Sequence, residues 1–203
     1  GLYSDLSMIL LGWILETIHG DRLDSLGTLH IFAPLGMADT FHSPTDAPIP
    51  RPAAAFAATE NCPWRREVLR GRVHDDNCYV MGGVSGHAGL FSTAADIFKF
   101  ARALIAGHLV PRDVVDLFWT RAGVPGSDRA LGWDTKSENG SQAGTKISPL
   151  SVGHTGFTGT SLWIDRARDV VVVLLTNRVH PRRDNELIKI WRPTIHDAVF
   201  SSL

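Results

Sequence analysis

The stretch that decides the fold is His154-Thr155-Gly156-Phe157-Thr158-Gly159-Thr160-Ser161-Leu162-Trp163-Ile164-Asp165. Its first half places small and hydroxyl side chains around glycines, a composition typical of backbone that turns tightly or closely approaches another group. Its second half is followed by the β-branched run 170–176. Two strands with a turn at 165–169 are therefore expected, making an antiparallel hairpin.

Strands are expected late in the chain and helices early. Helices are predicted over residues 6–19, 24–32, 93–106, a segment after Pro111, and 185–200. Gly20 and Gly107 are placed to end the first and third of these helices, and Ser92 or Thr93 is placed to cap the third, with Asp96 completing a capping box. Pro193 should kink or split the last helix.

The other elements complete an α+β order. Residues 41–72 are rich in proline and lack periodicity, which predicts a long irregular loop. Strands are predicted at 130–133, 161–164 and 170–176. A mainly helical region with a long loop, about residues 1–125, should thus precede sheet strands and a C-terminal helix, about residues 126–203.

Composition excludes several classes of partner. With a net charge of −1 and a pI near 6.8, nothing favours nucleic acid or an anionic membrane. The histidines show no zinc-ligand spacing, and no metal or cofactor is expected. Cys62 and Cys78 are expected to be free thiols, with a disulfide between them left open. No signal peptide is visible, and the start at Gly1 is read as a truncation or a processed end.

A second chemical motif, Tyr3-Ser4-Asp5, stands just before the first expected helix. Ser4 or Asp5 can cap that helix. The motif also places a phenol, a hydroxyl and a carboxylate side by side, all of which can exchange hydrogen bonds or protons. Both uses are compatible, and both are expected here.

Together, the two motifs resemble two of the three active-site motifs of the penicillin-recognising serine hydrolases, which include class C β-lactamases, DD-peptidases and related esterases. Two further segments resemble the same family in the same order: Pro34-Leu35-Gly36-Met37-Ala38-Asp39-Thr40 and Gly89-Leu90-Phe91-Ser92-Thr93-Ala94-Ala95-Asp96. The third motif, Ser-x-x-Lys, holds the nucleophile. No serine of this chain has lysine three residues later. The resemblance therefore covers the C-terminal portion of the family, from the tyrosine onward.

The resemblance implies a β-lactamase/transpeptidase-like fold, with an antiparallel sheet flanked by helices plus a mainly helical region, here incomplete at the N-terminus. It implies that Tyr3 assists proton transfer and that the backbone N–H of Phe157 donates to the oxyanion. Asp5, in place of the usual Asn, would contact the substrate. His154, Thr155 and Gly156 would hold the substrate carboxylate, with His154 replacing the usual lysine. Family members of this kind are periplasmic or secreted.

The implied function is hydrolysis through an acyl-enzyme, with the nucleophile missing from this chain and the chain therefore inactive alone. The substrate would be a D-Ala-D-Ala peptide, a β-lactam or a short ester. A non-catalytic binding or scaffold protein on the same fold remains an alternative, as does an unrelated hydrolase using Ser4 or Ser85; the near-match Gly83-Val84-Ser85-Gly86-His87 ends in histidine and lacks the context of a nucleophile elbow. Self-association through an exposed sheet edge, or pairing with the missing N-terminal portion, is expected.

Overall fold

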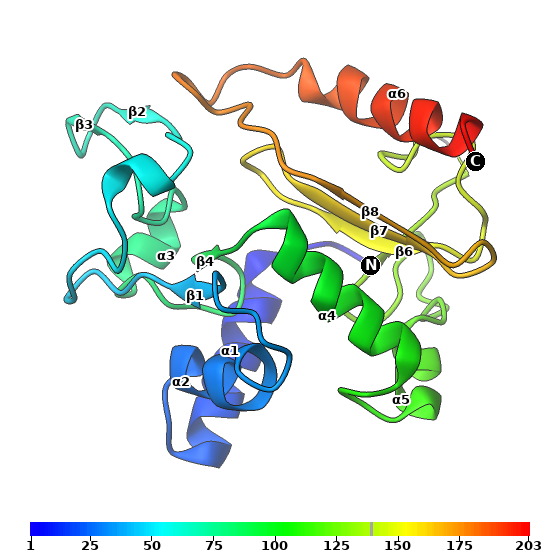
Figure 1. The fold of residues 1–203 in the computed structure, drawn as a ribbon, viewed down its shortest axis with the longest axis horizontal. Helices are drawn as coiled ribbons and strands as arrows, with labels where there is room; N and C mark the ends of the chain where they lie inside the picture. Colours follow the sequence, from blue (N-terminus) through cyan, green and yellow to red (C-terminus); the bar gives the residue numbers. More distant parts are fainter. Residues whose placement is uncertain (139) are drawn as a thin grey trace. The chain divides into compact units, whose positions relative to one another are not determined.

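The computed structural model describes residues 1–138 and 140–203, which divide into two compact units (Figure 1). Unit 1 contains Gly1, residues 97–178 and residues 184–203; unit 2 contains residues 2–96 and 179–183. None of the described helices is both long and apolar enough to cross a membrane. The expected division near residue 125 into helical and sheet regions stays a prediction.

A four-stranded antiparallel sheet organises unit 1. Its strands, in spatial order, are β5 (Asp134–Thr135), β6 (Val152–Thr155), β7 (Ser161–Asp165) and β8 (Val170–Leu174). The β7–β8 hairpin predicted from the sequence is confirmed, with Ser161 opposite Leu174 and Asp165 opposite Val170. Because β8 pairs only with β7, its outer edge has no neighbouring strand in this sheet.

Alternation along the strands gives the sheet two apolar faces. Helices lie on both sides of the sheet (Figure 1). Val152 and Ile164, which are register partners, pack with helices α4 (Ala94–Ala106) and α5 (Arg112–Phe118). Trp163 points to the other face, is 1% exposed, and packs with Phe200 of α6 (Ile188–Ser201). Helices thus cover both faces of β6 and β7 and hold these strands rigidly.

The structure differs from the sequence-based predictions at three places in unit 1. Residues 130–133 are not a strand: Ala130 N–H donates to the Trp133 carbonyl at 3.0 Å around Gly132, whose φ of 77° turns the chain, and β5 begins only at Asp134. The segment 152–155 is itself a strand that the sequence analysis missed. Pro193 does not split α6; the Lys189 carbonyl that proline leaves without its helical donor accepts from the Gln142 side chain at 3.4 Å instead.

Helix α1 (Asp5–His19) opens unit 2. The Ser4 hydroxyl accepts from the Leu6 N–H at 3.3 Å and caps the helix, and Gly20 ends it with φ 70°, both as predicted. Most of its large apolar side chains are exposed, and Gly12 is its one buried member. These exposed residues are Leu6, Leu10, Leu11, Trp13, Ile14, Leu15 and Ile18, here called the α1 apolar surface. A helix that is apolar on several sides normally lies inside a protein.

The rest of unit 2 consists of short elements. They are α2 (Leu23–Gly27), η1 (Thr28–Phe32), β1 (Phe41–His42), η2 (Ala53–Ala55), β2 (Asn61–Cys62), β3 (Glu67–Val68), α3 (Asp76–Val80) and β4 (Leu90–Phe91). Short strands and turns thus fill the long irregular segment. Both cysteines are buried free thiols, and burial raises the pKa of Cys78 to about 12.

The start of α4 contains one hydrogen bond of the predicted capping box. The Thr93 hydroxyl accepts from the Asp96 N–H at 3.3 Å. The Asp96 carboxylate also accepts from the Asp39 N–H at 2.8 Å and from the Thr40 hydroxyl at 3.1 Å. The carboxylate therefore ties the segment around Thr40 to the beginning of the helix.

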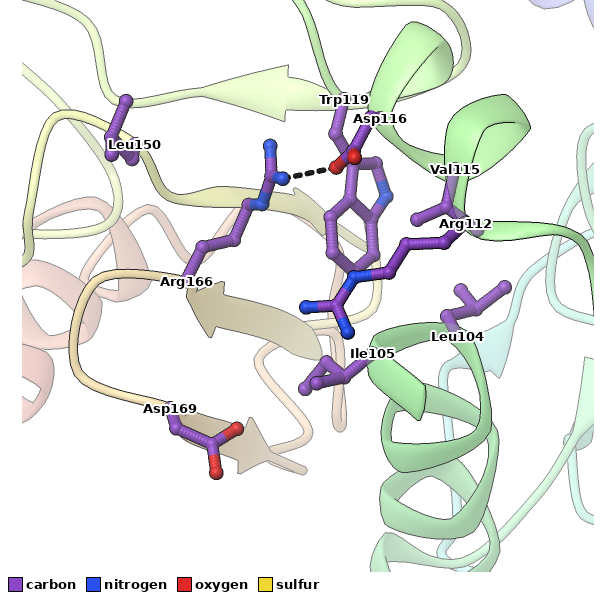
Figure 2. Close-up of a pocket in the computed structure, with 9 residues that line it drawn as sticks. All are labelled: Leu104, Ile105, Arg112, Val115, Asp116, Trp119, Leu150, Arg166 and Asp169. Atoms are coloured by element: carbon purple, nitrogen blue, oxygen red, sulfur yellow. Dashed lines mark hydrogen bonds and ion pairs between the residues drawn. The ribbon is translucent and has the colours of Figure 1, made fainter. Parts of the chain in front are cut away.

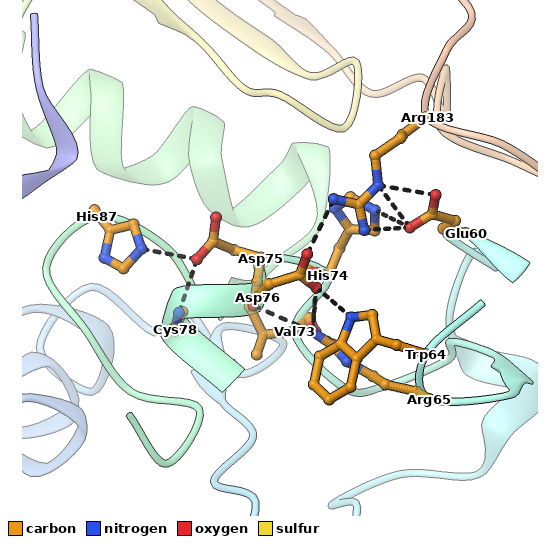
Figure 3. Close-up of polar contacts among 10 residues, drawn as sticks. All are labelled: Glu60, Trp64, Arg65, Val73, His74, Asp75, Asp76, Cys78, His87 and Arg183. Carbon is orange, nitrogen blue, oxygen red and sulfur yellow. Dashed lines mark hydrogen bonds and ion pairs between the residues drawn. The ribbon is translucent and has the colours of Figure 1, made fainter. Parts of the chain in front are cut away.

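A charged network joins distant segments of unit 2 (Figure 3). Arg183 donates to both Glu60 oxygens, at 2.5 to 2.9 Å, and to Asp76 at 3.0 Å. The Arg65 guanidinium lies over the rings of Trp64 and Tyr79 and donates to Asp76 at 2.9 Å. The hydrogen bonds from Arg183 hold the pKa of Glu60 below its ordinary value, against the opposing effect of burial.

This network predicts an acid-dependent loss of stability. Because the pKa of Glu60 is lowered in the folded state, its ionised form stabilises the fold above the unfolded-state pKa of about 4.3, and the stabilisation is lost as pH falls through the folded-state pKa. Glu60→Gln should lower the free energy of unfolding at pH 7 by about 1–3 kcal/mol and flatten its fall in acid. Urea denaturation between pH 2 and 7 measures both. Glu67→Gln, at an exposed residue of the same unit, is the control, and an equal effect of the two variants would contradict the prediction.

Candidate active site

The His-Thr-Gly motif lies at the end of a strand, not at the start of one. His154 and Thr155 are the last residues of β6 and pair with Leu162 and Ser161 of β7. The chain then reverses through residues 156–160, here called the HTG turn. The expected strand after the motif exists as β7, but the motif itself is fixed by pairing on β6.

The HTG turn has little room for side chains. A Cβ at Gly156 would lie 2.2 Å from the Thr160 hydroxyl, and Gly159 has a φ of 113°. The Gly156 N–H donates to the Thr160 carbonyl at 2.8 Å, and the Gly159 N–H donates to the Gly156 carbonyl at 3.1 Å. Glycine is required at both positions by space or by conformation.

Side chains from other elements hold the carbonyl groups of the HTG turn. Arg178 donates to the Phe157 carbonyl through Nε at 2.7 Å and to the Thr158 carbonyl through its backbone N–H at 2.9 Å. Its guanidinium also lies 4.1 Å from the centre of the Phe157 ring. The Gly159 carbonyl accepts from Thr176 at 2.5 Å. The turn is therefore fixed before any ligand arrives, as an oxyanion-binding segment must be.

His154 lies beside a cation and makes two hydrogen bonds. Its Nδ1 lies 2.9 Å from the Thr155 carbonyl, which can only accept, so Nδ1 carries the proton. Its Nε2 lies 3.4 Å from Nη1 of Arg129, which can only donate. The same Arg129 nitrogen pairs with Asp134 at 2.6 Å. Arg129 thus brings a positive charge beside His154.

Sequence reasoning missed Arg129, Arg178 and Arg192. One signal was available for Arg129: the absence of lysine from the His-Thr-Gly motif should have prompted a search for another cation. The other two arginines act on backbone carbonyls of the HTG turn, and no motif marks that role. The structure brings His154, Thr155, Gly156 and Phe157 together in unit 1, and it places Tyr3 and Asp5 together at the start of α1 in unit 2. The catalytic roles of these residues stay predictions.

Ser85, His87 and Asp75 form a hydrogen-bonded network in unit 2 with the connectivity of a catalytic triad. Figure 3 shows the contact between His87 and Asp75. His87 Nε2 lies 2.8 Å from the Asp75 carboxylate, and its Nδ1 lies 2.8 Å from the Ser85 hydroxyl. The orientation is inverted, however: Ser85 is 7% exposed, whereas the Asp75 side chain is 35% exposed. A nucleophile must face its substrate, so the hydrogen bonds among Ser85, His87 and Asp75 are better suited to holding the glycine-rich loop that contains Ser85 and His87 in place.

That loop presses against α1. A Cβ at Gly86 would lie 2.2 Å from the Met8 carbonyl, so the two backbones approach as closely as glycine permits. Asp75 also caps α3 by accepting from the Cys78 N–H at 2.7 Å. The hydrogen bonds among Ser85, His87 and Asp75 therefore fix the glycine-rich segment that follows α3 in the sequence. This segment packs against α1, the helix that begins after Tyr3.

A pocket of 240 Å³ in unit 1 contains none of the candidate residues (Figure 2). It lies where α4 and α5 approach the β7–β8 turn. Asp116 forms an ion pair with Arg166, whose guanidinium lies 5.2 Å from the centre of the Trp119 ring. Most charged side chains that line the pocket are therefore already paired, Asp116 with Arg166 and Asp169 with Arg102. The pocket does not include the HTG turn.

Comparisons with known proteins find relatives of similar sequence. A "Putative D-alanyl-D-alanine carboxypeptidase" of Escherichia coli K12 is 34% identical over 200 residues, which are 88% of this chain and 45% of that protein. An "N-acetylmuramyl-L-alanine amidase" of Bacillus subtilis is 35% identical over 202 residues, 88% of this chain and 44% of that protein. The chain therefore spans about half the length of the curated relatives that it matches.

Solved structures share the fold. A β-lactamase from Mycobacterium bovis matches with a TM-score of 0.71 and 22% identity, over 99% of this chain and 64% of that one. A penicillin-binding protein from Bacillus halodurans matches with a TM-score of 0.65 and 17% identity, over 97% of this chain and 55% of that one. The fold is thus β-lactamase/transpeptidase-like and α+β, as predicted. The family model described as Beta-lactamase matches residues 2–192, and the chain accordingly belongs to the β-lactamase family of serine hydrolases.

Proposed function

We propose that this chain supplies the tyrosine motif and the HTG turn of a serine hydrolase that works through an acyl-enzyme, and that the nucleophile lies outside these 203 residues. The observation that carries the proposal is the HTG turn, whose carbonyl groups are fixed by Arg178, Thr176 and Arg192. Each fixed carbonyl shares a planar peptide with the N–H of the next residue, so the N–H groups of the turn are fixed as well. Prearranged backbone donors stabilise the charge of an acyl-transfer transition state. The absence of Ser-x-x-Lys from the sequence supports the proposal that the nucleophile lies outside these residues.

The mechanism assigns one step to each motif. An upstream serine attacks the substrate carbonyl while Tyr3 assists transfer of its proton. The N–H of Phe157 donates to the oxyanion. The leaving group departs, and water then hydrolyses the acyl-enzyme. Asp5 contacts the substrate near Tyr3.

The proposed substrate is a cell-wall peptide with a free carboxylate, such as one ending in D-Ala-D-Ala. Arg129 and the Thr155 hydroxyl offer a cation and a hydrogen-bond donor at one end of β6, which suits a carboxylate, and His154 contacts Arg129 through Nε2. The names of the relatives, a putative D-alanyl-D-alanine carboxypeptidase and an N-acetylmuramyl-L-alanine amidase, support an amide bond of a cell-wall peptide as the bond that is cleaved. A β-lactam or a short ester remains a candidate probe.

A polypeptide preceding this chain is the proposed partner. The relatives are about twice as long, and the α1 apolar surface is bare in unit 2. In unit 1, the outer edge of β8 offers unpaired backbone groups along a run of valines. An upstream portion that carries Ser-x-x-Lys would cover such surfaces and complete the catalytic groups.

A non-catalytic binding protein on the same fold is the second candidate, favoured by the missing Ser-x-x-Lys alone. The two candidates differ in a polypeptide extended upstream to the length of the relatives. An enzyme hydrolyses an acyl-D-Ala-D-Ala peptide or a p-nitrophenyl ester, whereas a binding protein retains the peptide without turnover.

Replacing the tyrosine tests the mechanism in the extended polypeptide. Tyr3→Phe removes only a hydroxyl and should lower the rate of acylation by about 10²–10⁴-fold, with little change in KM, because proton transfer is lost. Single-turnover kinetics with the ester measures this rate. Tyr79→Phe is the matched control, since the chain has two tyrosines and the Tyr79 ring can still lie under Arg65. Equal rates in Tyr3→Phe and the wild type would rule out the proposed role.

The uncovered surfaces predict that the 203-residue chain associates with itself. Sedimentation velocity should show oligomers that increase with concentration. Trp13→Glu on the α1 apolar surface should weaken the association, and Trp191→Glu, which changes another exposed tryptophan on α6, is the control. A wild-type chain that remains monomeric at high concentration would refute the idea that these surfaces need a cover.

A further inference from the structure

Arg192 of α6 is a buried cation that has no acidic partner among the described residues. Arg192 is 5% exposed, and none of the carboxylates in residues 1–138 and 140–203 forms an ion pair with it. It donates to the Gln142 side chain at 3.2 Å, and its buried Nε has no hydrogen-bond partner among these residues. Burial lowers the pKa of Arg192, although arginine stays charged in proteins.

Such an arrangement is unfavourable for stability. A buried charge is expensive unless a counter-ion or a full set of hydrogen bonds compensates it. Apolar residues often replace buried charges with no loss of stability, or with a gain. The arginine therefore needs an explanation other than packing, and groups with perturbed protonation and uncompensated burial concentrate at functional sites.

The remaining contacts of Arg192 provide that explanation. Its Nη2 donates to the Gly156 carbonyl at 3.3 Å and to the Thr160 carbonyl at 3.2 Å, the two ends of the HTG turn. The Gly156–Phe157 peptide is trans, so the Gly156 carbonyl and the Phe157 N–H point to opposite sides of one plane. When the Gly156 carbonyl points toward Arg192, the Phe157 N–H consequently points away from Arg192.

The charge acts in the same direction as the geometry. A guanidinium behind the peptide polarises it, which makes the N–H on the far side a better donor to a negative oxygen. The effect is strong because the charge is buried and no carboxylate neutralises it, and low local polarity strengthens electrostatic interactions.

We propose that Arg192 is a positioning residue for the oxyanion donor: through the Gly156 carbonyl it orients and polarises the peptide whose N–H, on Phe157, binds the oxyanion. The role rests on the proposed acyl-enzyme function. It assigns a use to α6, and it gives a reason for a buried cation there that has no acidic partner among the described residues.

The test uses the extended polypeptide that forms an acyl-enzyme. Arg192→Met keeps the length and apolar stem of the side chain but removes its donors and charge. It should lower the acylation rate about 10²–10³-fold, as expected for a disabled oxyanion donor, with KM changed far less. Arg192→Lys restores a charge and one donor and should recover part of the rate. Lys189→Met, at an exposed residue of the same helix, removes one positive charge and should leave the rate unchanged.

Stability and the Phe157 amide separate positioning from structural support. The free energy of unfolding of Arg192→Met should be unchanged or higher, because a buried uncompensated charge has been removed. The amide NMR signal of Phe157 should shift in Arg192→Met and stay in place in Lys189→Met. An unchanged acylation rate in Arg192→Met would overturn the role, as would a lower rate that comes with lost stability and no recovery in Arg192→Lys. A wild-type protein that forms no acyl-enzyme would instead overturn the proposed function, and the role with it.

Discussion

The pairing of β6 with β7 is the constraint on which the candidate site depends. Four register pairs, from Val152 opposite Ile164 to Thr155 opposite Ser161, force the chain to reverse within residues 156–160. Trp163 reinforces the pairing by packing against Gly153, where a Cβ would lie 2.4 Å from the indole ring. In this short reversal, carbonyl groups of the HTG turn accept hydrogen bonds from Thr176, Arg178 and Arg192. Because each carbonyl shares a planar peptide with the next N–H group, these bonds also fix the direction of the N–H groups.

Electrostatic groups are arranged differently in the two units. In unit 2, Glu60, Asp76 and Arg183 neutralise one another and tie separate segments together. In unit 1, Arg129 is partly balanced by Asp134, whereas Arg192 is buried with carbonyl groups and one amide. Neutralised pairs suit a stable framework, and an uncompensated cation beside the HTG turn suits chemistry in which negative charge develops.

Much of the fold was accessible from the sequence, because local signals decide it. The 3.6-residue period gave α1 and α4, and the valine run gave β8. The failures have physical causes. The strand expected at 130–133 reads as apolar, but Gly132 at positive φ turns the chain there. Strand β6 was missed because its glycine and histidine do not resemble a strand, and only the close packing of Trp163 on Gly153 explains them.

The site was predictable where a motif marks it and not elsewhere. The motifs indicated His154 and Thr155, and the structure places them with Gly156 and Phe157 around one turn. Arg178 and Arg192 were not predictable, since they act on backbone carbonyls from segments that are distant in sequence. The triad-like chain of Ser85, His87 and Asp75 could be judged only from burial, which the sequence does not contain.

The central claim is that this chain carries part of an acyl-transfer site and that its nucleophile lies elsewhere. The most direct measurement is intact mass after incubation with a fluorophosphonate and, separately, with a penicillin, using the 203-residue chain alone and then mixed with the upstream portion. The account predicts no adduct on the chain alone, and in the mixture one adduct that peptide mapping places on the upstream serine. An adduct within the 203 residues, at Ser85 or Ser4, would contradict it.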